Sequence, residues 1–259
     1  MKGLKDSSYL HTICESGSCP NKAECWGAGT ATFMILGDIC TRNCRFCNVK
    51  TGKPFPPDPA EPKRVAEAIE ALGVKHCVIT SVDRDDLPDG GAAAWAQAIR
   101  AVKEAAPDTT IEALIPDFKG SVASIRLVIE ARPEVISHNL ETVRRLTREV
   151  RTFADYDTSL GVIRTITEHG NIRVKSGIML GLGETEEEIL QTMDDLLEAN
   201  CQVITIGQYL QPTSKHLPVQ KYVHPDDFKR YGEIALQKGF MFAESAPLVR
   251  SSYHAEKHV

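Results

Sequence analysis

The chain of 259 residues lacks three features that would each point to a definite class of protein. No apolar run approaches the roughly 18 residues that cross a membrane. The opening segment, residues 1–8, has no apolar stretch of the kind found in a secretory leader. The net charge is −5, so the basic excess typical of nucleic-acid binders is also missing. We therefore expect a cytoplasmic protein that binds neither a membrane nor a nucleic acid.

The composition is otherwise that of an ordinary globular protein. Apolar residues make up 42% and charged residues 25% of the chain, so a sizeable core can form. This length suits one large domain, and single α/β barrels often reach it. We expect one main domain.

The cysteines are the most informative residues, because six of the eight lie between Cys14 and Cys47. Scattered core thiols would not cluster in this way. In a reducing compartment, clustered cysteines are more often metal ligands than disulfides. The other two, Cys77 and Cys201, each lie at the start of an apolar run, and we expect them to be inert core thiols.

Cys40, Cys44 and Cys47 form a C-x3-C-x2-C run directly after the apolar segment 32–38. Three thiolates at this spacing can bind three irons of a four-iron, four-sulfur cluster and leave the fourth iron without a protein ligand. An open coordination position is typical of catalytic metal sites. Half a zinc site or a disulfide is the alternative, although zinc would need a fourth ligand nearby.

A second set, Cys14, Cys19 and Cys25, has the spacing C-x4-C-x5-C among Gly, Ser, Pro and Asn residues. Such residues form turns, which can wrap a short loop around a compact object. Taken alone, this spacing fits a zinc knuckle or unrelated cysteines equally well. The neighbouring three-cysteine run favours a second cluster.

Beyond a proline-rich segment, 54–62, helical and strand patterns alternate along the chain. Strands are predicted at 32–38, 77–82, 110–115, 134–139, 173–180 and 202–206, with a last apolar run at 240–242. Helices are predicted at 62–73, 92–106, 121–131, 158–169 and 225–239, and one more is capped by Thr185 and Glu188.

This alternation favours right-handed βαβ crossovers and a parallel sheet. About six βα units are too few for a closed eight-unit barrel. We therefore predict an α/β fold, a parallel partial (β/α)6 barrel over residues 32–245. An N-terminal cluster-binding extension, 1–31, precedes it, and a C-terminal tail, 246–259, follows it.

Polar residues follow the predicted strands, where βα folds place their functional side chains. Ser81 follows the second strand, and Asn139 and Glu141 follow the fourth. These side chains can bind ribose hydroxyls, or they can cap turns and helices instead. A basic group comes next in the chain: Arg144, Arg145, Arg148 and Arg151. It is either a solvated helix face or a site for a carboxylate or an acidic partner.

The cysteine run 40–47, with Phe46 before its last cysteine, resembles the signature of the radical S-adenosylmethionine (SAM) enzymes. In that superfamily the open iron binds the amino and carboxylate groups of SAM. The run 177–184 resembles the superfamily's G-x-I-x-G-x-x-E strand, which contacts adenine, with Met179 in the isoleucine position. The SAM-binding residues that this resemblance implies are Phe46, Ser81, Asn139, Glu141, Arg151 and Met179.

Three elements together resemble one family, the lipoyl synthases. They are Cys-Glu-Ser-Gly-Ser-Cys-Pro-Asn-Lys-Ala-Glu-Cys-Trp at 14–26, Cys-Thr-Arg-Asn-Cys-Arg-Phe-Cys at 40–47 and Arg-Ser-Ser-Tyr-His-Ala at 250–255. The resemblance spans about residues 10–254, and the first and last elements are far more specific than the general radical SAM motif. Family members commonly have a longer segment before the first cysteine motif than the thirteen residues that precede Cys14 here.

The resemblance implies that two sulfur atoms are inserted at C6 and C8 of an octanoyl chain, which is held by an amide on a lysine of a lipoyl carrier protein. Cys40, Cys44 and Cys47 would hold the cluster that cleaves SAM to a 5′-deoxyadenosyl radical. The second cluster would be the sulfur source, consumed in the reaction; its ligands would be Cys14, Cys19, Cys25 and a serine. We assign this serine to Ser252, with Ser251 as the near alternative.

The resemblance also implies partners. The carrier would be a lipoyl domain of a 2-oxo acid dehydrogenase or the glycine cleavage H protein, and the electrons would come from a donor such as flavodoxin or ferredoxin. We expect a monomer. One alternative is another sulfur-inserting or methylthiolating radical SAM enzyme, which would share residues 40–47 but lack the serine-bearing tail. The other is an electron-transfer or cluster-carrier protein, which would not explain why each cysteine set has three members.

Overall fold

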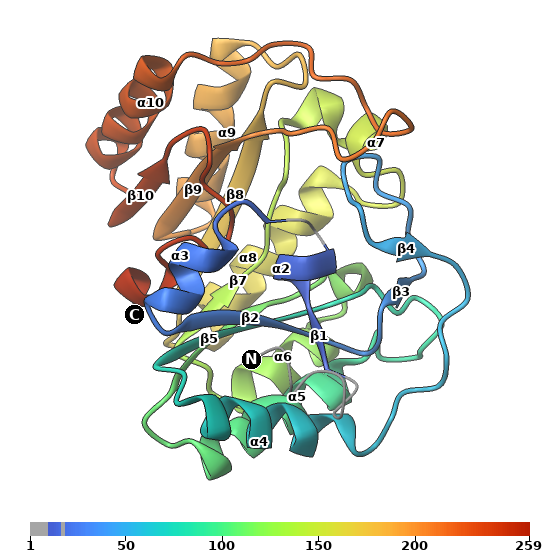
Figure 1. The fold of residues 1–259 in the computed structure, drawn as a ribbon. Helices are drawn as coiled ribbons and strands as arrows, with labels where there is room; N and C mark the ends of the chain where they lie inside the picture. The colour runs from blue at the N-terminus through green and yellow to red at the C-terminus, as the bar shows by residue number, and fades with distance from the viewer. Residues whose placement is uncertain (1–9, 17–18) are drawn as a thin grey trace.

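The computed structural model describes residues 10–16 and 19–259. Its centre is an eight-stranded sheet in the order β1-β2-β5-β6-β7-β8-β9-β10 (Figure 1). All neighbours from β2 onward pair in parallel, and β1 pairs with β2 antiparallel. The strands of this sheet are β1 (His11–Thr12), β2 (Thr30–Ile35), β5 (His76–Ser81), β6 (Thr110–Leu114), β7 (Val135–Ser137), β8 (Arg173–Leu180), β9 (Val203–Gln208) and β10 (Phe242–Ser245). A separate parallel pair consists of β3 (Ile39–Cys40) and β4 (Lys50–Thr51).

Each strand from β2 to β9 is followed by a helix before the next strand of the sheet. These helices are α4 (Glu61–Leu72), α5 (Ala92–Ala105), α6 (Val122–Glu130), α8 (Tyr156–His169), α9 (Glu186–Glu198) and α10 (Pro225–Lys238). The prediction of about six βα units in a partial parallel barrel is therefore confirmed. The shorter helices are α2 (Ile13–Ser16), α3 (Lys22–Gly27), α7 (Thr147–Val150), η1 (Phe118–Gly120), η2 (Arg144–Leu146) and η3 (Ala255–His258).

The helix ends follow local rules that are visible in the sequence. Helix α4 has Pro62 in its first turn and ends at Gly73, whose φ of 59° suits glycine. At α9, the Thr185 side chain accepts from the Glu188 N–H and the Glu188 side chain accepts from the Thr185 N–H, which confirms the expected capping box. These contacts satisfy N–H groups that the helix itself leaves without partners.

Several strands differ in their bounds from the prediction; β7, for example, covers only Val135–Ser137 of the predicted 134–139. The backbone explains the differences at β2 and β10. Strand β2 ends at Ile35, earlier than expected, because Leu36 and Gly37 have positive φ values of 66° and 89°. Strand β10 starts later, at Phe242, because the N–H groups of Met241 and Phe242 both bond to the Gln202 carbonyl before pairing with β9 begins.

Most strands inside the sheet are buried on both faces, as expected for a parallel sheet covered by helices, whereas the four positions of the edge strand β10 are half-buried. All six positions of β2 and all six of β9 are buried. Cys77 and Cys201 are buried, in agreement with their expected role as core thiols. The fully buried Lys175 Nζ lies 2.9 Å from Glu112 Oε2, and the Ser137 hydroxyl donates to Glu112 at 2.8 Å. The two buried charges, Glu112 in β6 and Lys175 in β8, thus neutralise each other.

The N-terminal segment and the C-terminal tail pack against each other, and Figure 1 shows α3 beside the C-terminus. The Asn21 side chain donates to the Leu248 carbonyl at 2.6 Å, and the Tyr253 hydroxyl donates to Glu24 at 3.0 Å. Farther along the tail, Glu256 accepts from the Thr30 hydroxyl at 3.0 Å. The tail thus joins the start of β2 to the other end of the sheet, where Arg250 donates to the β9 carbonyl of Gln208 at 3.3 Å. No helix in the described ranges is long and apolar enough to cross a membrane.

The contact between the tail and β9 can be tested at Gly207. A Cβ atom on this residue would overlap the Val249 carbonyl oxygen. We expect Gly207→Ala to lower the free energy of unfolding by about 1–3 kcal/mol, because the tail must move. The measurement is anaerobic urea unfolding of the metal-free protein. Gly161→Ala in α8 is the control, since its added Cβ would meet nothing within 4 Å in the described residues besides its chain neighbours and the backbone of its own helix; equal stabilities of the two variants would contradict the packing.

Candidate functional site

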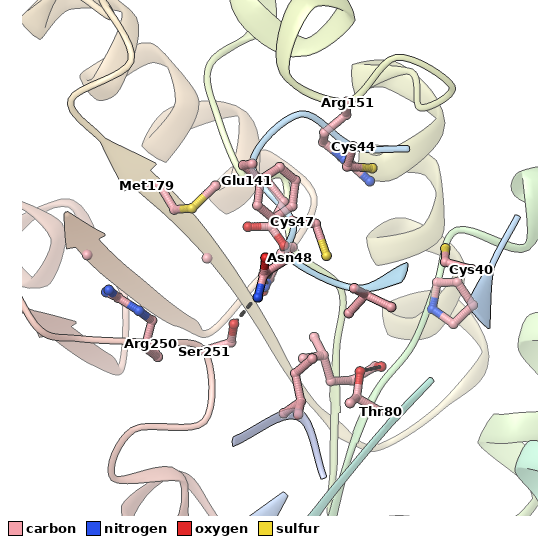
Figure 2. Close-up of a pocket in the computed structure, with 18 of the residues that line it drawn as sticks. Cys40, Cys44, Cys47, Asn48, Thr80, Glu141, Arg151, Met179, Arg250 and Ser251 are labelled. Carbon is pink, nitrogen blue, oxygen red and sulfur yellow. Dashed lines mark hydrogen bonds between the residues drawn. The ribbon is translucent and has the colours of Figure 1, made fainter. Parts of the chain in front are cut away.

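A cavity of about 550 Å³ lies at the carboxyl ends of the parallel strands. Its walls contain residues from the ends of β5, β6, β8 and β9 and from the loops after β3, β7 and β9. Figure 2 shows Cys40, Cys44 and Cys47 around this cavity together with Glu141, Met179, Arg151 and Ser251. The two segments that flank the barrel in the sequence also reach the cavity wall, through Pro20 and Arg250. The cavity therefore lies where the two cysteine segments and the tail meet.

The three cysteines of the first set lie on one tight loop. Cys40 ends β3, and the Cys47 N–H bonds back to the Cys44 carbonyl at 3.0 Å. The Thr41 N–H and hydroxyl both donate to the Asp83 carbonyl, at 3.1 and 2.9 Å, which ties the loop to the segment after β5. All three cysteine side chains line the cavity.

Their surroundings hold the thiols in the neutral form when no metal is present. Burial raises the pKa of Cys44 to about 12, and the Asp83 carboxylate adds to this rise. Burial also raises the pKa of Cys47 to about 11, with Cys40 contributing, so the thiols are close enough to affect one another. A nearby cation would be required to stabilise these cysteines as thiolates. Metal binding would therefore release the protons of the thiols.

The donor set fits an iron-sulfur cluster better than a single ion. Within residues 10–16 and 19–259, no three His, Cys, Asp or Glu side chains converge closely enough to hold one metal ion. Cys40, Cys44 and Cys47 are instead arranged around a shared cavity. A cluster with several irons takes one thiolate on each iron, so its ligands need not converge on one point.

Arg42, between the first two cysteines of the loop, forms a buried ion cluster that the sequence analysis missed. Its guanidinium is 5% exposed and donates to Asp85 at 2.7 and 2.9 Å and to Asp117 at 2.7 and 2.8 Å. Although burial opposes the change, Arg42 lowers the pKa of Asp117 to about 2. Because Asp85 follows β5 and Asp117 follows β6, Arg42 fastens the cysteine loop to two strands of the barrel.

The residues expected to bind SAM surround the same cavity. Glu141 lies beside β8, since its N–H bonds to the Gly177 carbonyl and its own carbonyl accepts from the Met179 N–H, both at 2.9 Å. Burial raises the pKa of Glu141. The Asn139 side chain donates to Glu141 at 3.0 Å, and its buried Oδ1 atom has no hydrogen-bond partner among the described residues. Phe46 also lines the wall.

Ser81 and Arg151 line the cavity but have structural partners as well. The Ser81 hydroxyl accepts from the Trp95 ring N–H at 3.2 Å, and Arg151 donates to the Leu140 carbonyl at 3.2 Å. The other three arginines of the basic group are exposed and pair with carboxylates, as a solvated surface would: Arg144 with Asp157, Arg145 with Glu188 and Arg148 with Asp155.

The second cysteine set lies next to the cavity and not in its wall. Cys14 is in α2 and Cys25 in α3, and the Cys19 N–H bonds to the Cys14 carbonyl at 3.1 Å. Burial raises the pKa of Cys25 to about 11, and the charges of Cys19 and Cys14 add to it, so the three thiols are near one another. Ser251 lines the cavity, whereas the half-buried Ser252 is not among its described lining residues. Residues 17 and 18 of this segment lie outside the described ranges.

Comparisons with known proteins agree with this site. The family model of the radical SAM superfamily matches residues 34–196. The chain is 60% identical over 259 residues to a lipoyl synthase of Flavobacterium johnsoniae, covering 100% of this chain and 90% of that protein. It is 61% identical over 258 residues to a lipoyl synthase of Bacteroides fragilis strain YCH46, covering 100% and 89%.

Solved structures resemble the fold at low sequence identity. Streptococcus suis SuiB bound to its precursor peptide SuiA gives a TM-score of 0.65 at 14% identity, covering 84% of this chain and 48% of that one. Coproporphyrinogen III oxidase (HemN) from Escherichia coli, a radical SAM enzyme, gives 0.52 at 14% identity, covering 86% and 55%. At these identities the likeness concerns the fold alone.

The Arg42 ion cluster gives a direct stability test. We expect Arg42→Lys to lower the free energy of unfolding of the metal-free protein by about 2 kcal/mol or more, because lysine cannot bond to both buried carboxylates. Anaerobic urea unfolding measures the change. Arg148→Lys is the matched control, since Arg148 is 70% exposed and its pair with Asp155 contributes little. A loss no larger than that of the control would show that Arg42 does not fasten the loop.

Proposed function

The chain belongs to the lipoyl synthases, a family within the radical SAM superfamily, and from this premise we propose which of its residues carry the reaction. The enzyme inserts sulfur at C6 and C8 of an octanoyl chain that is amide-linked to a lysine of a lipoyl carrier protein. When bound, one four-iron, four-sulfur cluster with SAM supplies a 5′-deoxyadenosyl radical that abstracts hydrogen, and an auxiliary cluster supplies sulfur.

Cys40, Cys44 and Cys47 hold the SAM-cleaving cluster in this proposal. The observation that carries it is their position: three thiols of one loop line a single cavity at the carboxyl ends of parallel strands. In βα folds, this end of the strands is where ligands bind. Because burial raises the pKa of each of these thiols, their environment favours a cationic group that would accept them as thiolates.

The same cavity offers contacts for SAM. Asn139 Oδ1 is a buried acceptor without a partner in the described part of the chain, which a ribose hydroxyl would satisfy, and the Glu141 carboxylate is a second acceptor beside it. Phe46 and Met179 supply apolar surface for adenine. Ser81 and Arg151 complete the proposed set; their bonds to Trp95 and Leu140 hold their side chains in the wall.

Cys14, Cys19, Cys25 and Ser252 hold the auxiliary cluster in this proposal. The support is the packing of the tail on α3, where Tyr253, next to Ser252 in the chain, donates to Glu24. A serine oxygen is a harder iron ligand than a thiolate, which suits a cluster that is dismantled during turnover. Residues 32–245 thus form the SAM-cleaving barrel, and residues 1–31 and 246–259 together form the sulfur-donating part.

We infer the position of the substrate from the same cavity. Ile13 and Pro20 of the N-terminal segment line the same cavity as Cys40, so an octanoyl chain entering it would lie between the two proposed clusters. Apolar groups at the wall, such as Leu210 and Pro212, suit an alkyl chain. We propose the lipoyl domain of a 2-oxo acid dehydrogenase or the glycine cleavage H protein as carrier, and flavodoxin or ferredoxin as electron donor.

The two cysteine sets are expected to respond differently to substitution. Reconstituted protein should bind about eight irons per chain, and Cys25→Ala about four, because one cluster of four is lost. The variant should still release 5′-deoxyadenosine from SAM but add no sulfur to an octanoyl-lysine peptide, since its sulfur source is missing. Cys44→Ala should lose both activities. Iron analysis, chromatography of the nucleoside and mass spectrometry of the peptide measure these outcomes.

Cys201→Ala is the control, because Cys201 is buried and lies outside the described cavity wall. It should keep both activities. Sulfur insertion by Cys25→Ala would contradict the role of the N-terminal cysteines. The alternative of an electron-transfer protein predicts no 5′-deoxyadenosine from the unchanged chain in the presence of SAM and dithionite.

Ser252 is expected to matter as an exchangeable ligand. Ser252→Cys should still bind about eight irons, because a thiolate ligates iron well. Sulfur insertion should fall while 5′-deoxyadenosine release continues, since the stronger ligand slows the loss of iron from the auxiliary cluster. A variant with unimpaired sulfur insertion would rule out this role for Ser252.

A further inference from the structure

We propose that Asn139 is a positioning residue for the auxiliary site: by holding Ser251 on the barrel, it leaves Ser252 facing the N-terminal cysteines. This inference rests on the proposed function, because it needs an auxiliary cluster bound by Cys14, Cys19 and Cys25. It gives the two neighbouring serines different tasks. Ser251 is the tether and Ser252 is the ligand.

The tether is a buried hydrogen bond between segments far apart in the chain. Asn139 follows β7 and is 7% exposed. Its Nδ2 atom donates to the Ser251 hydroxyl at 2.8 Å, drawn as the dashed line to Ser251 in Figure 2, and to Glu141 Oε1 at 3.0 Å. The Glu141 carboxylate accepts hydrogen bonds, so it orients the amide with its nitrogen toward the tail. Both amide hydrogens are thereby used.

The opposite side of the amide is fixed by β8. A Cβ atom built on Gly177 would lie 3.1 Å from Asn139 Oδ1 and 2.5 Å from the Thr205 hydroxyl. The absence of a side chain at Gly177 therefore lets Asn139 lie close over the strand. Asn139 is held between β8 and Glu141, and this position sets where Ser251 is anchored.

Ser252 lies between two anchored neighbours. On one side, Ser251 is bonded to Asn139; on the other, the Tyr253 hydroxyl donates to Glu24 of α3 at 3.0 Å. The first anchor is on the barrel, and the second is on the segment that carries the cysteines. Two fixed neighbours restrict the positions that the side chain between them can reach.

Hydrogen bonds on both sides of the serine pair reach the segment that carries the N-terminal cysteines. The Asn21 side chain donates to the Leu248 carbonyl at 2.6 Å, and the Tyr253 hydroxyl donates to Glu24 at 3.0 Å. Asn21 lies between Cys19 and Cys25 in the chain, and Glu24 is next to Cys25. The Ser251 hydroxyl faces the cavity and Asn139. The geometry therefore assigns the ligand role to Ser252.

The test uses Asn139→Ala, Ser251→Ala and the double variant, each measured in two states. In the metal-free protein, hydrogen exchange of residues 248–254 should become about 2- to 10-fold faster in either single variant, the effect of losing one hydrogen bond. The double variant should be no faster than the single ones, because both remove the same bond. After reconstitution, iron should fall from about eight toward about four per chain, with the loss confined to the auxiliary cluster.

A second readout separates positioning from general damage. Sulfur inserted per 5′-deoxyadenosine released should fall in Ser251→Ala, which leaves the Asn139 acceptor for SAM in place. Ser252→Ala should lose the auxiliary iron without faster exchange in the metal-free tail. Asn171→Ala is the matched control, since Asn171 is exposed and outside the described cavity wall; it should change neither readout.

Two results would overturn the inference. One is unchanged tail exchange and about eight irons in Asn139→Ala. The other is loss of the auxiliary iron in Ser251→Ala with retention in Ser252→Ala, which would make Ser251 the ligand. About four irons in the unchanged protein, together with faster tail exchange in Asn139→Ala, would instead refute the proposed auxiliary cluster and leave the tether standing.

Discussion

The site depends on the parallel pairing of the strands from β2 to β10. Parallel pairing brings every carboxyl end to the same edge of the sheet, and each crossover helix returns the chain to the opposite edge. The end of β8 and the loops after β5, β6, β7 and β9 therefore meet around one cavity although they are far apart along the chain. The cysteine loop that comes between β2 and β5 in the chain reaches the same cavity, and Arg42 fastens it there through Asp85 and Asp117.

Charge balance is the second constraint. The cavity holds three half-buried thiols and the Asp83 carboxylate, whose pKa is raised to about 6 by burial against the opposing effect of Arg42. Arg42 also bonds to Asp85 and Asp117, so its one positive charge is shared among three carboxylates. Such a site favours the binding of cationic groups, and iron with SAM provides them.

The tail connects three separate parts of the site. It bonds to β9 through Arg250, to the end of β7 through Ser251 and to α3 through Tyr253. One short stretch thereby connects the barrel with the segment that carries the second cysteine set. The position of Ser252 is then fixed by contacts on both sides and not by the local conformation of the tail alone.

The sequence by itself determined the main helices, the parallel pairing of the strands and the two cysteine sets, because periodicity, caps and ligand spacing are local properties. It also pointed to Asn139, Glu141 and Met179, which follow or end predicted strands. Only the tertiary structure decided the partners of Arg42 and the bond between Asn139 and Ser251, 112 positions apart in the chain. Contacts of this kind depend on which loops the sheet brings together, and a short-range sequence pattern does not predict which loops become neighbours.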